Sequence, residues 1–437
     1  MTLLIKNAQL VSGQIVNIFI KEDLIYDISQ KTPIADQIIE ADGNLAMPGI
    51  IDPHVHFRVP GAGYKEDWET GSKAAAAGGI TTVLDMPNNQ PPTISQKDLE
   101  RKGQLIRDRS YVNYGLYIGA TETNLEELKS AQNIVGIKVY LGSTTGNLLV
   151  RDYNIVEKIL RECDQLVAFH SEDEECILQN AKCPSNNAAG RQMSNVKDIP
   201  ELHSQMRPEE CAIESTQKII NIVKKTKKQA YICHVSSQKE LELIHQAKKS
   251  GQTIYAEATP HHLFLNTETA SKLNNFAKVN PPLRSEKTQR AMQSALNLID
   301  IIGTDHAPHT EEEKSRFYHQ APSGMPGLET SLPLMLNFYY QGKIGLDKIV
   351  ELMCRNPAKI FNIKKRGDIE PGFFADLTIV DLHLTKQVEN SKLYTKCKWS
   401  PFAGRRLRGW PIITLVNGQV VFQKNKIIGS PMGREVL

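Results

Sequence analysis

Apolar runs of strand length alternate with helix-like stretches through the middle of this 437-residue chain, and this rhythm constrains the fold more than any other feature. Adjacent parallel strands need a long crossover between them, and that crossover is usually a helix. The stretch from Glu66 to Ala77 has the pattern of such a helix, because it contains four consecutive alanines and stops at Gly78-Gly79. The eight apolar runs are Gly49 to His54, Thr81 to Met86, Val112 to Ala120, Val135 to Leu141, Gln165 to Ser171, Gln229 to Val235, Ile254 to Thr259 and Ile299 to Asp305.

The two ends of the chain show a different pattern, in which short strand-like runs follow one another without a helix. Asn417-Gly418 supplies a hairpin turn signal near the C-terminus. Eight parallel strands with intervening helices close naturally into a barrel. We therefore expect a (β/α)8 TIM-type barrel over residues 49–365 and a small β-sandwich domain formed by residues 1–48 and 366–437. The runs at the two ends are Leu3 to Val11, Ile15 to Glu22, Leu24 to Ser29, Ala375 to Leu382 and Thr414 to Phe422.

Charge and cysteine usage exclude several classes of protein. The formal net charge is +3, and the most basic stretch, Lys224 to Lys228, has the character of a solvated helix end rather than a nucleic-acid site. No apolar stretch is long enough to span a bilayer, and the N-terminus lacks the sections of a signal peptide. The seven cysteines are scattered and form no C-x-x-C pair. These features predict a cytoplasmic protein with reduced thiols.

Polar residues cluster at the ends of the predicted barrel strands. His54 and His56 lie two positions apart after the first run, so an extended backbone places both imidazoles on one face, where they can bind one metal ion. Active sites of such barrels lie at the C-terminal ends of the strands. Taken singly, the other candidates have alternative roles as core histidines or a helix cap. They are Lys138 in the fourth run, His170 and His234 at the ends of the fifth and sixth, and Asp305 at the end of the eighth.

Six candidate ligands are too many for one zinc ion, which takes three or four protein ligands, and they suit two ions. A lysine ammonium cannot coordinate a cation, because its nitrogen has no free lone pair. A neutral amine, however, adds carbon dioxide to become a carbamate, which has the shape and charge of a carboxylate. A carbamate on Lys138 would bridge the two ions. The alternative is an ion pair between Lys138 and Asp52 or Asp305.

These residues and several longer motifs resemble the amidohydrolase superfamily and, within it, the dihydroorotases. The resemblance runs from about Leu3 to Gly429, and its many motifs make it more specific than the His-x-His pair alone. It implies the reversible, zinc-dependent cyclisation of N-carbamoyl-L-aspartate to L-dihydroorotate, a step of pyrimidine biosynthesis. The motifs are Asp52-Pro-His-Val-His-Phe-Arg-Val-Pro-Gly61, Asp85-Met-Pro-Asn88, Ala256-Glu-Ala-Thr-Pro-His-His-Leu-Phe-Leu265, Val279-Asn-Pro-Pro-Leu-Arg284, Gly303-Thr-Asp-His-Ala-Pro-His-Thr310 and Gly324-Met-Pro-Gly-Leu-Glu-Thr330.

The resemblance also implies a role for each candidate ligand. Two Zn²⁺ ions would be bridged by the carboxylated Lys138. Asp305 would be the catalytic residue, because one of its oxygens binds metal and the other is free to move a proton. The implied ligands are His54, His56 and Asp305 for the more buried ion, and His170 and His234 for the more exposed one.

The substrate contacts come partly from chemistry and partly from the resemblance. Arg58 lies two residues beyond His56 on the same side, and a guanidinium holds a carboxylate with two parallel hydrogen bonds. For Asn88 and Asn280, which stand beside prolines, the alternative is an ordinary turn role. The departures from the usual family pattern, at Val59 and Asn89-Gln90, concern loops only. The contacts that the resemblance adds are Asn88, Asn280, His309, the backbone at Pro326-Gly327 and, in the small polar loop from Gly142 to Asn147, Thr144.

Two other functions remain as alternatives. A dihydropyrimidinase, hydantoinase or allantoinase would share the barrel, the zinc ions and the lysine, but the substrates of these enzymes lack the ring carboxylate that Arg58 suits. A catalytically inactive scaffold for aspartate transcarbamoylase is disfavoured, because the chain has all six ligands. We expect a small-molecule substrate and neither a nucleic-acid nor a membrane partner, and we leave open a homo-oligomer and an association with aspartate transcarbamoylase.

Overall fold

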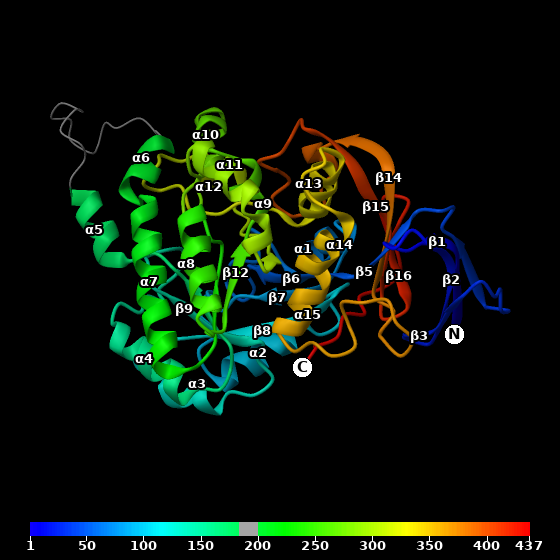
Figure 1. Cartoon of the computed structure of the whole chain (residues 1–437), viewed down its shortest axis with the longest axis horizontal. Coiled ribbons are helices and arrows are strands. Elements are labelled where there is room, and N and C mark those ends of the chain that lie inside the picture. Colours follow the sequence, from blue (N-terminus) through cyan, green and yellow to red (C-terminus); the bar gives the residue numbers. More distant parts are fainter. Residues whose placement is uncertain (183–199) are drawn as a thin grey trace.

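The computed structural model describes residues 1–182 and 200–437, which are organised around two β-sheets (Figure 1). The first is an eight-stranded parallel sheet in which each strand pairs with the next along the chain. All eight predicted runs are confirmed as strands of this sheet. They are β6 (Ile50–Val55), β7 (Ile80–Asp85), β8 (Asn113–Gly119), β9 (Gly136–Tyr140), β10 (Val167–His170), β11 (Ala230–Ile232), β12 (Ile254–Ala258) and β13 (Ile301–Ile302).

The sheet closes into a barrel just beyond its two edge strands. Val55 at the end of β6 forms a parallel bridge with His306, and the His56 amide donates to the His306 carbonyl at 2.8 Å. The strands are buried almost throughout, which explains why they are continuous apolar runs in the sequence. The predicted TIM-type barrel is therefore confirmed.

Helices follow most of the strands and surround the barrel (Figure 1). The longer ones are α1 (Trp68–Ala77), α2 (Gln96–Ile106), α4 (Tyr153–Glu162), α5 (Glu174–Lys182), α7 (Glu209–Thr226), α8 (Gln238–Lys249), α11 (Glu286–Ser294) and α13 (Leu328–Tyr340). The shorter ones are α3 (Leu125–Ser130), α6 (Pro200–Met206), α9 (Pro260–Phe264), α10 (Thr267–Leu273), α12 (Glu311–Lys314), α14 (Leu346–Val350) and α15 (Asn356–Ile360).

Helix α1 shows how local sequence sets an element's bounds. The Asp67 side chain accepts from the Thr70 amide and the Thr70 hydroxyl interacts with the Asp67 amide, which forms a capping box. The helix therefore begins at Trp68, two residues after the predicted start. It ends at Ala77 with Gly78 as its C-cap, as the glycine pair predicts.

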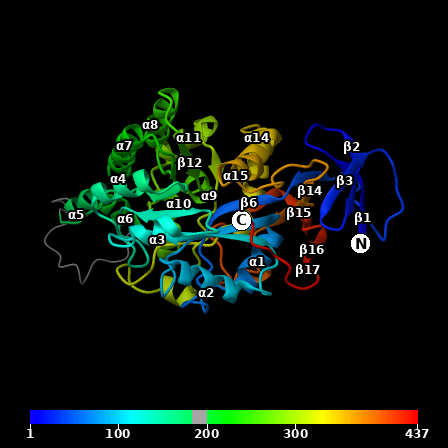
Figure 2. The ribbon, with the colours of Figure 1, turned by 90° about the horizontal axis from the view of Figure 1, so that it is seen from below.

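The second sheet is mixed and combines both ends of the chain, as predicted. Figure 2 shows the N-terminal strands in blue beside the C-terminal ones in orange and red. The two sets join where β5 pairs with β14 in antiparallel register. Asn417 and Gly418 both have positive φ, the conformation of the predicted hairpin turn. The strands are β1 (Thr2–Gln9), β2 (Ile15–Lys21), β3 (Leu24–Ser29), β4 (Gln37–Glu40), β5 (Leu45–Pro48), β14 (Leu377–Gln387), β15 (Arg406–Val416), β16 (Gln419–Gln423) and β17 (Lys426–Ile427).

The connection between β14 and β15, residues 388–405, returns to the barrel and packs against its C-terminal strand ends. The Trp399 indole donates to the His309 carbonyl at 2.7 Å. The amides of Tyr394 and Thr395 donate to the half-buried Glu329 carboxylate at 2.9 and 3.0 Å. The second sheet therefore contributes residues to the loops that surround the candidate site.

The cysteines depart from the expectation that all thiols are reduced. A disulfide joins Cys176 in α5 to Cys211 in α7, so that expectation is wrong for this pair. Thirty-five positions separate the two cysteines, and only the packing of the two helices brings them together. Cys183 lies outside the described residues, and the other four cysteines are buried free thiols. Among the described residues, no helix is both long enough and apolar enough to cross a membrane.

Candidate metal centre and substrate cavity

The six predicted ligands are all buried and converge at one end of the barrel. The Nε2 atoms of His54 and His56 lie 3.3 and 3.0 Å from Oδ1 of Asp305. Nδ1 of His170 lies 3.0 Å from Nε2 of His234. The rings of His54 and His234 are 5.4 Å apart, so the two groups adjoin. The alternation along β6 therefore places His54 and His56 on one face, as expected.

Left-handed backbone turns the site residues toward the centre. Arg58, His234 and Asp305 have φ values of 63°, 37° and 46°. Such values are uncommon for residues other than glycine, and where they occur they cluster at functional sites. At His234 the turn breaks the strand alternation, and Sγ of the preceding Cys233 also lies inside the barrel, 2.9 Å from Nζ of Lys138. From the sequence we expect Cys233, as the neighbour of His234 on a strand, to face away from the site, and the structure shows that this expectation is wrong.

Two buried carboxylates, which the sequence analysis did not identify, orient the imidazoles. Glu257 in β12 contacts Nδ1 of His54 at 2.8 Å and accepts from the His234 amide. Glu172 contacts Nε2 of His170 at 3.0 Å and pairs with Arg207. Carboxylates in this position fix the tautomer of a metal-binding histidine. They leave Nε2 of His54 and Nδ1 of His170 directed toward the centre of the site.

The charges of the site suit a bound cation. Burial lowers the pKa of His54, but the Glu257 and Asp305 carboxylates outweigh burial and raise it to about 10. Burial lowers the pKa of His56 to about 4. Burial acts to raise the pKa of Asp305, but His54 and His56 hold it well below its usual range. Two buried carboxylates thus compete for one imidazolium, and His54, His234 and Asp305 together present ligand atoms close enough for one ion. This donor set fits a metal centre.

Lys138 lies at the middle of the barrel and is fully buried. Within residues 1–182 and 200–437, no carboxylate lies within ion-pair distance of its Nζ atom. Asp52 accepts instead from the amide and hydroxyl of Thr304, at 3.0 and 2.6 Å. The alternative in which Lys138 pairs with Asp52 or Asp305 therefore does not hold in this structure.

A cavity beside the ligands contains several of the predicted substrate contacts. Its wall also includes Ser323 and Gly324, which the sequence analysis missed, although Gly324 begins one of the quoted motifs. Gly324 has a φ of 137°, and an added Cβ would meet the Ala307 carbonyl, so only glycine fits there. Beside the six ligands, the cavity is lined by Arg58, Asn88, Tyr140, Thr144, Thr145, Val279, Asn280, Ala307, Ser323 and Gly324.

Pro326 and Gly327 do not line this cavity. They border a separate small pocket together with His306, Thr395 and other residues. The Gly327 amide donates to Nδ1 of His306 at 3.1 Å, so this N–H already has a partner. The structure therefore brings Ser323 and Gly324, rather than Pro326 and Gly327, to the cavity wall.

Arg58 is a buried cation at the cavity wall. Its Nε donates to the Pro308 carbonyl at 3.2 Å, and Nη2 lies 3.1 Å from Nε2 of His309. Burial and the Arg58 charge hold the pKa of His309 well below its usual range, so His309 is neutral. Among the described residues, no carboxylate forms an ion pair with Arg58. A buried guanidinium without a counter-ion suits an anionic ligand in the cavity.

The remaining predicted contacts connect the cavity to its loops. Oδ1 of Asn88 contacts Nδ1 of His56 at 2.7 Å, and its amide donates to the Thr145 carbonyl. Oδ1 of Asn280 contacts Nε2 of His203 at 2.8 Å. Thr144 lines the cavity beside Asn88. Both asparagines thus have structural partners as well as a place in the wall.

Comparison with known proteins identifies the family. Residues 45–421 match the sequence model of the Amidohydrolase family. The chain belongs to this family. An amidohydrolase relative from Methanosphaera stadtmanae, a dihydroorotase, is 36% identical over 431 residues and covers 97% of each chain. A dihydroorotase from Pyrococcus furiosus is 36% identical over 419 residues, covering 96% of this chain and 91% of that protein.

Solved amidohydrolase structures share the fold over nearly the whole length. L-hydantoinase (dihydropyrimidinase) from Arthrobacter aurescens superposes with a TM-score of 0.93 and 30% identity, covering 99% of this chain and 98% of the other. Dihydropyrimidinase from Brevibacillus agri gives a TM-score of 0.90 at 25% identity, with the same coverage. This likeness extends to the sheet formed by both termini and identifies the chain as a cyclic amide hydrolase by fold and family.

Proposed function

We propose that this amidohydrolase is a dihydroorotase, which interconverts N-carbamoyl-L-aspartate and L-dihydroorotate. The observation that carries the proposal is Arg58, a buried guanidinium with no carboxylate partner among the described residues, at the wall of a cavity that also contains the candidate metal ligands. Dihydroorotate carries a ring carboxylate, whereas hydantoin and dihydrouracil do not. The dihydroorotases among the relatives support this reading over the hydantoinase alternative that the solved structures offer.

The donor set supports two Zn²⁺ ions. His54, His56 and Asp305 would hold one, and His170 and His234 the other, with a carbamate on Lys138 between them. When bound, the ions would lower the pKa of a water in the cavity and polarise the amide carbonyl. Lys138 is fully buried, and among the described residues no carboxylate occupies Nζ in an ion pair, which leaves this atom available for the carbamate. The proposed metal ligands and substrate contacts all lie in one chain, so the proposal does not depend on a second copy or on aspartate transcarbamoylase.

The protein's own groups bind the substrate and move its proton. Arg58 binds the substrate carboxylate, and Asn88 and Asn280 orient the ring with Thr144 above it. Oδ1 of Asp305 faces the His54 and His56 imidazoles. Oδ2 would then take a proton from the attacking water and deliver it to the departing ring nitrogen during hydrolysis. During cyclisation it would remove that proton from the carbamoyl nitrogen and return it to the departing hydroxide as water.

A substrate comparison tests the proposal. The purified protein is incubated with Zn²⁺ and bicarbonate, and the absorbance of dihydroorotate, dihydrouracil, hydantoin and allantoin is followed while elemental analysis gives the metal content. We expect rapid turnover of dihydroorotate, little of the other three, and about two zinc ions per chain. Comparable rates with dihydrouracil or hydantoin would move the assignment to that class. Absence of both zinc and turnover would favour the inactive scaffold.

A further inference from the structure

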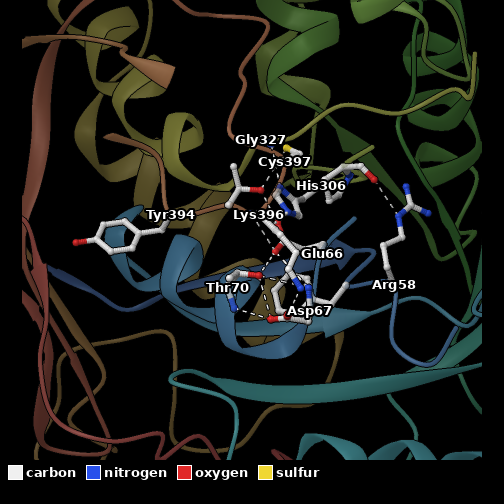
Figure 3. Close-up of polar contacts among 12 residues, drawn as sticks. Arg58, Glu66, Asp67, Thr70, His306, Gly327, Tyr394, Lys396 and Cys397 are labelled. Atoms are coloured by element: carbon white, nitrogen blue, oxygen red, sulfur yellow. Dashed lines mark hydrogen bonds and ion pairs between the residues drawn. The ribbon is translucent and has the colours of Figure 1, made fainter. Parts of the chain in front are cut away.

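Glu66 is a fully buried carboxylate between the barrel and the connection from the second sheet, and it lies outside the candidate metal centre (Figure 3). Its oxygens accept from the backbone amides of Asp67 and Lys396, each at 3.2 Å. They also accept from the hydroxyls of Thr70 and Thr395. The fifth partner is Nε2 of His306, at 3.3 Å. Each of these five groups can therefore act as a donor, which suits the acceptor oxygens of the Glu66 side chain.

These contacts determine which nitrogen of His306 carries the proton. The Gly327 amide donates to Nδ1 at 3.1 Å, so Nδ1 has to be an unprotonated acceptor. Nε2 then carries the hydrogen and donates it to Glu66. Because a carboxylate only accepts, Glu66 selects this tautomer, and the tautomer in turn binds the Gly327 amide. Figure 3 shows Glu66, His306 and Gly327 in this order, with Lys396 next to Glu66.

Gly327 ends the segment that forms one wall of the cavity. Ser323 and Gly324, three and four residues earlier, line the cavity directly. The backbone of His306 is held separately, because it bridges Val55 on one side and Met325 on the other. Asp305 therefore keeps its place through the backbone, and the bridge to Met325 also fixes the middle of residues 323–327. The His306 ring holds the far end of this segment, at Gly327. Loss of the ring contact should loosen the wall but not displace the metal ligands.

We propose that Glu66 is a positioning residue for this cavity wall and acts through His306, with Thr395 and Lys396 of the second sheet's connection holding Glu66 in place. The consequence for catalysis rests on the proposed function, since it concerns how tightly dihydroorotate binds. The series of contacts from Glu66 through His306 to Gly327 does not depend on the proposed function, because it is a property of the fold. Residues of the second sheet's connection would thus control substrate affinity in the barrel without touching the substrate.

Three substitutions separate the two contacts of His306. In His306→Asn, the side-chain oxygen takes the place of Nδ1 and keeps an acceptor for the Gly327 amide. In His306→Gln, the amide reaches the place of Nε2 and keeps a partner for Glu66, but the acceptor for Gly327 is lost. In Glu66→Gln, an NH₂ group faces donors, so the His306 tautomer is no longer selected. Glu329→Gln is the control, because Glu329 binds the Tyr394 and Thr395 amides without contacting His306.

The first measurement is hydrogen exchange at the Gly327 amide. It is read by mass spectrometry of peptides that span residues 325–328. KM and kcat for dihydroorotate, zinc content and Tm are the second. We expect His306→Gln and Glu66→Gln to exchange faster than wild type, to raise KM by about tenfold and to change kcat by less than about threefold, as loss of one buried hydrogen bond implies. Zinc content and Tm should stay near wild type. His306→Asn and Glu329→Gln should resemble wild type in exchange and KM.

The proposal would be overturned if the Gly327 amide of His306→Gln exchanged at the wild-type rate. It would also be overturned if kcat of His306→Gln or Glu66→Gln fell while KM stayed constant, or if KM rose as much in His306→Asn as in His306→Gln. If the wild-type protein does not turn over dihydroorotate, the exchange data still decide the role of Glu66, and the failure belongs to the proposed function alone.

Discussion

Nδ1 of His54 lies 2.8 Å from Oε1 of Glu257, 203 residues further along the chain, and this contact leaves Nε2 of the same ring 3.3 Å from Asp305. The carboxylate also accepts from the Tyr231 hydroxyl at 2.7 Å and from the His234 amide at 2.8 Å. One buried side chain therefore orients ligands of both proposed ions. Partners of this kind often affect metal affinity nearly as much as the ligands themselves.

Replacement of Glu257 should weaken metal binding. In Glu257→Gln an NH₂ group would face donors, so we expect zinc affinity to fall by about 10- to 100-fold, as is typical when such a partner is lost. Competition with a chromophoric chelator measures the change. Tyr231→Phe is the control, since it keeps the Glu257 contact with His54 and should retain zinc. Wild-type affinity in Glu257→Gln would contradict the orienting role.

Lys138→Ala tests the carbamate. Loss of the bridge between the ions should lower turnover by about a thousandfold, because metal-held nucleophiles contribute several kcal/mol of transition-state stabilisation. A small carboxylic acid added to this variant should restore part of the activity by occupying the vacated space. Cys233→Ala, which removes the sulfur 2.9 Å from Nζ but no proposed ligand, should keep activity within a few fold. An active Lys138→Ala protein would remove the carbamate from the mechanism.

Arg58 should determine selectivity for the acidic ring. Arg58→Lys keeps a charge but loses the planar pair of donors, so KM for dihydroorotate should rise by about 10- to 100-fold. Arg58→Met, which also removes the charge, should raise it further. The weak turnover of dihydrouracil, which has no carboxylate, should change little in either variant. A parallel loss of activity on both substrates would show that Arg58 has a structural role instead.

His203 should make the folded protein less stable at acid pH. Burial, reinforced by the Arg207 and Lys278 charges, lowers the pKa of His203 from 6.5 to about 3. The unfolded chain then binds a proton that the folded chain does not, so stability should fall as the pH decreases from about 6.5 toward 3, by up to about 1.4 kcal/mol per pH unit. His203→Gln should flatten the curve of unfolding free energy against pH in this window. Equal slopes for the two proteins would show that His203 remains neutral in both states or titrates in both.

The sequence was most informative where a residue's environment is set by its near neighbours. A strand buried on both faces has to be continuously apolar, so the eight barrel strands were recognisable as runs. The period of two placed His54 and His56 on one face, and Asn417-Gly418 marked a hairpin. Strand ends were less accurate: β11 and β13 stop short of the predicted runs, and His234 and Asp305, which lie beyond these strands, adopt left-handed backbone.

Contacts between distant parts of the chain had no such local signal. Glu257 and Glu66 are ordinary glutamates in the sequence, and only the closed barrel brings each to a histidine. Glu172 differs, because it lies two residues after His170 and this spacing was a local signal. The Cys176–Cys211 disulfide likewise depends on helix packing. Ser323 and Gly324 line the cavity in place of Pro326 and Gly327, and the Gly327 amide binds His306 instead.

The sequence by itself therefore determined the barrel, the joining of both termini in one sheet, and the six candidate ligands, since each follows from burial patterns or from residue type at a strand end. The tertiary structure alone decided which nitrogen of each imidazole faces the centre, which segment borders the cavity and which thiols pair. The physical reason is that a hydrogen bond or disulfide depends on the distance between two atoms in space, and residues more than 200 positions apart acquire a defined distance only when the chain has folded.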